Sequence, residues 1–319
     1  MNFSSLVTII ATLFLLLICG YFARKRDIIT QGMSKHLSNL ILKIGQPMMI
    51  ISALVEAEFS YENLKDAAII VVVGVFLHLF LSVVAYFACF RFKDLDERKL
   101  TEFSLVFANC GFIGFPIMEA LFGPKGLFLA SFFVISFHIF LWTWGIAILA
   151  RKRSDIKLTV KKIFINFGTI PCLIGILIYL LAIPFPNFVM PEFISKFMIY
   201  LSNLCTPISV LITGALLASR SLKQMFISPK MYYFSFFKLI VMPLLVCTLA
   251  TLVRLDHETV LFCTAMASLP SAATITMFSE VYDINSGYAA QTVGFSSLLS
   301  VLTIPIVLKA AEWIIAALS

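Results

Sequence analysis

The sequence predicts an all-α membrane protein with ten transmembrane helices, arranged as two inverted five-helix repeats with broken crossover helices 4 and 9. Three observations lead to this fold class. The chain has 319 residues, of which 61% are hydrophobic and only 13% are charged. Its apolar runs repeatedly reach the roughly 20 residues that a helix needs to cross a bilayer. Several residues of the first half of the chain also have a counterpart in the second half at a nearly constant distance along the sequence.

Charged or proline-rich breaks divide the chain into ten apolar segments. The segments are approximately residues 4–23, 33–55, 63–90, 100–121, 126–150, 164–183, 193–218, 230–253, 258–281 and 287–311. The first segment lacks a positive charge before its apolar run and has Arg24-Lys-Arg26 after it, the reverse of a cleaved secretory signal. We therefore expect the first segment to be retained as a helix.

The basic residues indicate an orientation. With the N-terminus outside, sixteen of the 24 Lys and Arg residues fall in the predicted inner loops and five fall on the outer side. The positive-inside rule then predicts a multi-pass membrane protein with both termini outside. The net charge of +7 does not indicate nucleic-acid binding, because these residues form short clusters between spans.

The long basic loop over 151–163 divides the segments into a first repeat, 1–150, and a second repeat, 164–319. An odd number of helices in each half makes homologous halves run in opposite directions. Pro47 precedes Pro207 by 160 residues. A shift of 161 residues places Asn109 on Pro270, Glu119 on Glu280 and Gly126 on Gly287. Inverted repeats with interrupted helices at matching positions are typical of secondary transporters.

The fourth segment contains the clearest interruption, Asn109-Cys-Gly-Phe-Ile-Gly-Phe-Pro116. Asn109 can cap a half-helix, Gly111 and Gly114 tolerate unusual dihedrals and close approach, and Pro116 ends a hydrogen-bond ladder. A break of this kind in a membrane helix persists only where it lines a polar cavity or is buried in protein. A simple proline kink packed against a neighbouring helix is the alternative interpretation.

The ninth segment offers a matching break in Ser268-Leu-Pro270-Ser271-Ala-Ala-Thr274. Half-helix N-termini that point to one place concentrate positive potential there, and amide and hydroxyl groups add hydrogen-bond donors. These properties favour an organic anion as the solute. The sequence therefore predicts a substrate-binding site at Asn109, Gly111, Gly114, Pro116, Pro270, Ser271 and Thr274.

Ionisable residues inside membrane spans are costly and usually face a cavity or a partner. The candidates for ion coupling or a polar core are Lys43, His78, His138 and Lys238, together with Glu119 and Glu280 at the ends of the broken segments. A histidine bonded to a neighbouring helix, a snorkelling lysine and an interfacial glutamate are the structural alternatives. The seven cysteines are scattered singly, so no metal site is expected. No catalytic motif is present, and we expect neither enzymatic activity nor a cofactor, although Na⁺ or H⁺ coupling stays open.

The chain resembles the auxin efflux carrier family of membrane transporters over nearly its whole length. The sharpest matches are Asn109 to Gly123 and Ser268 to Pro305. The resemblance implies a fold similar to the bile acid sodium symporters, a scaffold of helices 1, 2, 6 and 7, and a transport bundle of helices 3–5 and 8–10. It also implies elevator-type movement of that bundle, with Asn109 at the first crossover, Pro270 at the second, and a homodimer formed through the scaffold. The short central loop favours a prokaryotic-type member of the family, located in the plasma membrane, here a bacterial inner membrane.

Together, the residues and the resemblance predict a secondary transporter that moves a small organic anion by alternating access. The sequence leaves two alternatives to this function open. A sodium-coupled bile-acid-type symporter would need convergent carbonyls and carboxylates around a cation. An anion receptor or channel would bind the same solute without carrying it, although such proteins more often have a substantial soluble domain. Substrate identity and direction of transport have no visible motif.

Overall fold

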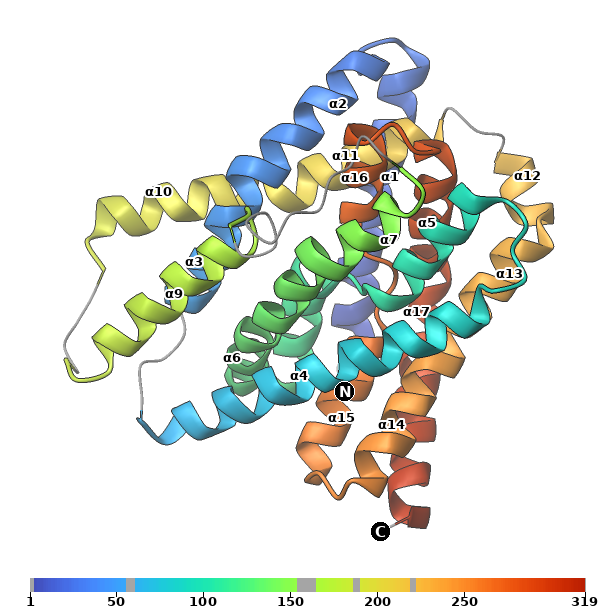
Figure 1. The fold of residues 1–319 in the computed structure, drawn as a ribbon. Helices are drawn as coiled ribbons and strands as arrows, with labels where there is room; N and C mark the ends of the chain where they lie inside the picture. The colour runs from blue at the N-terminus through green and yellow to red at the C-terminus, as the bar shows by residue number, and fades with distance from the viewer. Residues whose placement is uncertain (1–2, 56–60, 154–164, 186–189, 219–221, 319) are drawn as a thin grey trace.

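The computed structural model describes residues 3–55, 61–153, 165–185, 190–218 and 222–318, and these residues form helices joined by short turns, with no β-strand among them (Figure 1). The α-helices are α1 (Phe3–Lys25), α2 (Gln31–Leu40), α3 (Gln46–Val55), α4 (Tyr61–Ala88), α5 (Leu95–Val106), α6 (Phe115–Phe140), α7 (Ile146–Ala150), α9 (Thr169–Ala182), α10 (Glu192–Asn203), α11 (Cys205–Leu217), α12 (Leu222–Ile227), α13 (Pro229–Phe236), α14 (Met242–Leu252), α15 (His257–Ser268), α16 (Thr274–Val281) and α17 (Ser286–Leu318). The π-helical segments are η1 (Ile41–Gly45), η2 (Cys110–Gly114), η3 (Leu141–Gly145) and η4 (Phe237–Val241).

Six stretches of the described chain are helical, long and apolar enough to cross a membrane. They are Gly32–Val55, Leu64–Ala88, Ile117–Ala150, Glu192–Leu217, Pro229–Leu252 and Ser286–Leu318, and α9 is a shorter apolar helix. The all-α membrane fold is therefore confirmed. The division into ten spans and two inverted repeats stays a prediction.

The break between the predicted fourth and fifth segments lies at Gly123, where φ is +66°. L-residues rarely adopt this left-handed conformation, which glycine reaches without a Cβ penalty. Pro124 follows and cannot continue the hydrogen-bond ladder of the preceding turn. The chain therefore bends sharply inside α6, and the predicted boundary between residues 121 and 126 is confirmed.

Helices α1 and α11 pack against each other so closely that their backbones touch. A Cβ added to Gly20 would lie 2.1 Å from the carbonyl oxygen of Leu211, and one added to Gly214 would lie 2.0 Å from that of Leu17. Small residues at membrane helix interfaces allow this approach and so increase van der Waals contact. The first predicted segment is thereby joined to the seventh.

A second contact joins the predicted second and sixth segments, because α3 packs on α9. In Figure 1, α3, α9 and α10 lie together at one side of the molecule, while α13, α14 and α17 lie at the other. The first predicted segment therefore contacts the seventh, and the second contacts the sixth. A pseudo-two-fold axis relating the two five-helix halves would produce this pair of contacts, because it exchanges the first segment with the sixth and the second with the seventh. The buried core runs between these sides.

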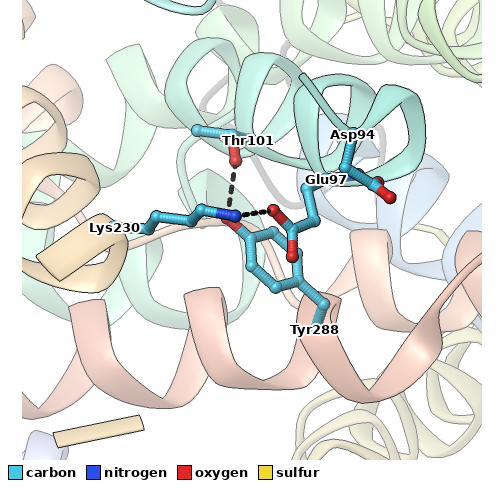
Figure 2. Close-up of polar contacts among 5 residues, drawn as sticks. All are labelled: Asp94, Glu97, Thr101, Lys230 and Tyr288. Carbon is cyan, nitrogen blue, oxygen red and sulfur yellow. Dashed lines mark hydrogen bonds and ion pairs between the residues drawn. The ribbon is translucent and has the colours of Figure 1, made fainter. Parts of the chain in front are cut away.

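Polar contacts hold the first half of α5 in place (Figure 2). The Asp94 carboxylate caps the helix by accepting a hydrogen bond from the Glu97 amide at 2.8 Å. Glu97 pairs with Lys230 of α13, and the Thr101 and Tyr288 hydroxyls lie 2.9 Å apart, which ties α5 to α17. The residues before the helix break are therefore fixed to two elements of the second half of the chain.

Further along α5, the fully buried Glu102 carboxylate accepts two hydrogen bonds of 2.8 Å from the guanidinium of Arg151. This pairing raises the pKa of Arg151, mainly through the hydrogen bonds to Glu102. Arg151 begins the predicted basic loop. Residues 154–163 of this loop lie outside the described part of the chain. The loop is thus anchored to α5 where it starts.

The close contact at Gly214 predicts that alanine substitutions at two glycines will affect stability differently. Gly214→Ala places a methyl group against the Leu17 carbonyl and should destabilise the protein by about 1–3 kcal/mol. Gly32→Ala, in α2, meets no atom within 4 Å and should leave stability unchanged or raise it by about 0.5–1 kcal/mol. Thermal unfolding of the purified protein measures both, and equal shifts would contradict the close packing.

The Glu102–Arg151 pair predicts strong coupling between two substitutions. Arg151→Met leaves a buried carboxylate without its partner and should cost about 3–5 kcal/mol. Adding Glu102→Gln to that variant removes the buried charge and should recover much of the loss. A double-mutant cycle of unfolding midpoints tests this, and additive effects would show that the pair is not coupled.

Candidate functional site

The two predicted helix breaks lie against each other and are joined through their backbones. Ala108, just after α5, forms an isolated antiparallel bridge with Ser271, just after α15. The Asn109 amide donates to the Pro270 carbonyl at 2.8 Å, and the Ala272 amide donates to the Phe107 carbonyl at 3.0 Å. Both predicted breaks are therefore present, between α5 and η2 and between α15 and α16, while their match as parts of an inverted repeat stays a prediction.

The break frees carbonyls in the last turn of α5, and specific side chains satisfy them. In a continuous helix, the amides of residues 108 and 109 would donate to the carbonyls of Ser104 and Leu105. Instead, the Ser104 carbonyl accepts from the Ser271 hydroxyl at 2.9 Å, and the Leu105 carbonyl accepts from Lys238 Nζ at 3.1 Å. The interrupted helix end is thus completed by the ninth segment and by η4.

The chain turns back into a helix at Asn109. Its carbonyl accepts hydrogen bonds from the amides of Ile113, at 3.3 Å, and Gly114, at 2.9 Å. Among the described glycines, only Gly123 has a positive φ, so Gly111 and Gly114 are not needed for unusual dihedrals. Gly111 instead provides close approach, because a Cβ there would lie 2.9 Å from the Met49 methyl group.

A small cavity of about 20 Å³ lies beside this break. Its lining residues are Leu13, Phe14, Leu17, Asn109, Ile113, Val210, Thr213 and Ser297. Three of them are polar and come from three parts of the chain: Asn109, Thr213 of α11 and Ser297 of α17. This volume is the space open to the centre of a water-sized sphere, and one water molecule needs at least about 10–15 Å³ of it, so the cavity holds little more than one water. A molecule larger than water would fit only if the walls separated.

Of the predicted substrate-binding residues, Asn109 is the one that lines this cavity. Ser271 is fully buried, and its amide donates to the Ser296 hydroxyl while its own hydroxyl is bonded to Ser104, so it holds the crossover together. Thr274 is buried at the start of α16, outside the cavity lining. Pro270 contributes its carbonyl to the bridge, and Pro116 is the second residue of α6.

Thr213 and Ser297 were not predicted as site residues. The Thr213 hydroxyl donates to the Ser209 carbonyl at 2.8 Å and lies 3.2 Å from the Thr276 hydroxyl of α16. The segment Leu211-Ile-Thr213-Gly214 carries a signal in retrospect, because a hydroxyl precedes the glycine that contacts α1. Ser297 is one of two consecutive serines, and nothing in the sequence separates their roles.

The buried histidines have local partners. The His78 Nδ1 atom lies 2.6 Å from the Gly74 carbonyl oxygen, and its ring packs among the rings of Phe107, Phe133 and Phe140. The His138 Nδ1 atom lies 3.4 Å from Gln46 Nε2 of α3, leaving His138 Nε2 and Gln46 Oε1 without a partner among the described residues. The first is bonded within its own helix, and the second across a helix contact.

The other ionisable candidates divide by exposure. Lys43 and Glu119 have exposed side chains, so they do not belong to the buried polar region. Glu280 is buried near the end of α16. Lys238 is fully buried, which excludes the snorkelling alternative. Within the described residues, no group of three His, Cys, Asp or Glu side chains is placed to hold a metal ion.

The π-helical segments coincide with this region. Segment η2 begins directly after Asn109, η4 contains Lys238, η1 ends one residue before Gln46, and η3 begins three residues after His138. Single π-helical turns are uncommon and often occur at functional sites, because the wider turn re-aims side chains and frees backbone groups. The unusual helical geometry is therefore concentrated where polar side chains enter the core.

The chain is similar to known transporters along nearly its full length. Residues 5–308 match the family described as membrane transport protein. A protein described as an uncharacterized transporter from Methanocaldococcus jannaschii is 27% identical over 303 residues, covering 93% of this chain and 96% of that protein. An uncharacterized transporter from Escherichia coli K12 is 20% identical over 306 residues, covering 91% of this chain and 93% of that protein. The chain therefore belongs to the membrane transport protein family, which is of the auxin efflux carrier type.

Proposed function

We propose that this protein is a secondary transporter that moves a small organic anion across the plasma membrane by alternating access. The substrate is a mono- or dicarboxylate or an auxin-like acid. One observation carries the proposal: the cavity beside the helix break is lined by Asn109 at the break itself and by residues of α1 and α11 opposite it. A binding site with walls from two separate groups of helices is what alternating access requires.

The cavity chemistry suits an organic acid. The Asn109 side-chain amide and the Ser297 hydroxyl can donate hydrogen bonds to a carboxylate. The Thr213 hydroxyl can do so by turning away from the Ser209 carbonyl to which it donates here. Segment η2 begins at Cys110, so the positive end of its helix dipole lies next to the cavity. Leu13, Leu17 and Val210 provide an apolar wall for the hydrocarbon part of the solute.

Transport in this proposal is an elevator-type displacement. Helices α1, α2, α3, α9, α10 and α11 form the scaffold, and the remaining helices form the moving bundle. The bridge between Ala108 and Ser271 supports this division, because it joins the two breaks into one unit that would move together. A homodimer through the scaffold would hold it still in the lipid, and the basic loops would keep both termini outside.

Proteoliposomes test the proposal directly. Uptake and efflux of radiolabelled mono- and dicarboxylates should be measured with sodium and proton gradients imposed separately. Saturable movement of one acid is the expected result, and the gradient that drives it identifies the coupling ion. A sodium requirement would favour the sodium-coupled symporter, while binding without movement would favour the receptor or channel.

Asn109→Ala should weaken binding of the transported acid by roughly 10- to 100-fold, the loss expected for one hydrogen bond to a charged group of about 1.5–3 kcal/mol. Folding should be preserved, because the backbone amide and carbonyl that form the crossover contacts remain. Equilibrium binding and gel filtration measure the two properties. An unchanged dissociation constant would remove the Asn109 side chain from the site.

Thr213→Val tests the opposite wall of the cavity and has a matched control. Thr213 and Thr248 both donate to the carbonyl four residues earlier in their own helices, at 2.8 and 2.9 Å. Only Thr213 lines the cavity. Thr213→Val should therefore weaken acid binding by roughly 10-fold, while Thr248→Val should not change it. Equal effects of the two substitutions would contradict a role for Thr213 in the site.

A further inference from the structure

Lys238 occupies an unusual position for a basic residue. It lies in η4, its side chain is fully buried, and Nζ donates to the Leu105 carbonyl at the end of α5. No carboxylate of the described residues lies within ion-pair distance of Nζ, although Glu97, Glu102 and Glu258 all pair with other basic residues. A buried lysine is expensive unless its surroundings favour a cation, so the position needs an explanation.

The end of α5 favours a cation for two reasons. The last carbonyls of a helix carry the negative end of its dipole, and here one of them has lost its amide partner because the Asn109 amide donates to Pro270 instead. In transporters with broken helices, such C-terminal ends and unwound carbonyls are the groups that coordinate coupling cations. Lys238 therefore supplies positive charge at a place suited to a dissociable cation.

The corresponding position of the first half carries a different basic residue. Lys238 follows His78 by 160 residues, the spacing that also separates Pro47 from Pro207. The His78 ring packs against Phe107 at the break, yet its Nδ1 atom is engaged with Gly74 of its own helix. The basic side chain that reaches the end of α5 is therefore Lys238, from the second half of the chain.

We propose that the Lys238 ammonium is a built-in cation that takes the place of a dissociable coupling cation at the end of α5. The crossover is then complete without bound Na⁺, and the protonated Lys238 side chain places a positive charge at the end of α5. Lys238 is a positioning residue in this proposal, because it acts on a solute through the break rather than by contact. Its link to an organic anion rests on the proposed function, whereas cation independence does not.

The first experiment uses the purified wild-type protein without any organic anion. Its thermal unfolding midpoint is measured in sodium, potassium and N-methyl-D-glucamine chloride at one ionic strength. Equal midpoints are expected, because the cation site is already filled. A saturable rise specific to Na⁺ would overturn the proposal, and this result depends on no variant.

The second experiment removes the Lys238 ammonium by substitution and then supplies a small soluble ammonium ion in its place. Lys238→Ala should lower the midpoint by roughly 5 °C or more, and methylammonium should restore at least half of that loss. Methanol, a neutral hydrogen-bond donor of similar size, should not restore it. Lys238→Met should also be destabilised but should not respond, because its side chain fills the space. Lys309→Ala, at an exposed position of α17, is the matched control and should show no response.

These outcomes separate the cation proposal from the anion proposal. Equal rescue by methanol would reduce Lys238 to a hydrogen-bond donor, and no rescue by methylammonium in folded Lys238→Ala would also overturn its role as a cation. Neither measurement includes an acid, so a failure here leaves anion transport standing. Conversely, a carboxylate panel without transport would leave the cation result unchanged.

Discussion

The structure depends on the satisfaction of backbone groups at two interrupted helices inside an apolar protein. A helix that stops within a membrane leaves amides and carbonyls that lipid cannot satisfy. Here each break supplies what the other lacks: the Asn109 amide finds the Pro270 carbonyl, and the Ala272 amide finds the Phe107 carbonyl. The Ser104 and Leu105 carbonyls of α5 accept hydrogen bonds from Ser271 and Lys238. The positions of α5, α15, η2 and η4 follow from this exchange.

The same exchange explains which parts could be predicted from the sequence. The breaks were predictable, because asparagine, glycine and proline within an apolar run have strong local preferences that no neighbour is needed to explain. The sharp bend at Gly123-Pro124 was predictable for the same reason. The six long apolar helical stretches follow from composition, because hydrophobic length alone determines whether a helix can cross a bilayer.

The roles of individual side chains were less accessible, because they depend on contacts between distant segments. Ser271 has the residue type and sequence position of a ligand contact, yet its partner is the Ser104 carbonyl, 167 residues away. Thr213 lines the cavity only because Gly20 and Gly214 bring α1 and α11 into backbone contact. Lys43 and Lys238 looked alike as lysines inside predicted spans, but one is exposed and the other fully buried. Sequence patterns identify the elements, whereas tertiary contacts decide which groups remain available.

The glycine contact between α1 and α11 has a further consequence for selectivity. Helices whose backbones already touch have no side-chain layer between them that could repack, so their separation is fixed at that level. Leu17 and Thr213 are the immediate neighbours, in space or in sequence, of these glycines, and both line the cavity. One wall of the cavity therefore has a fixed shape. In the proposed transport function, a solute too broad for this wall would be rejected by the backbone spacing of two helices rather than by any single side chain.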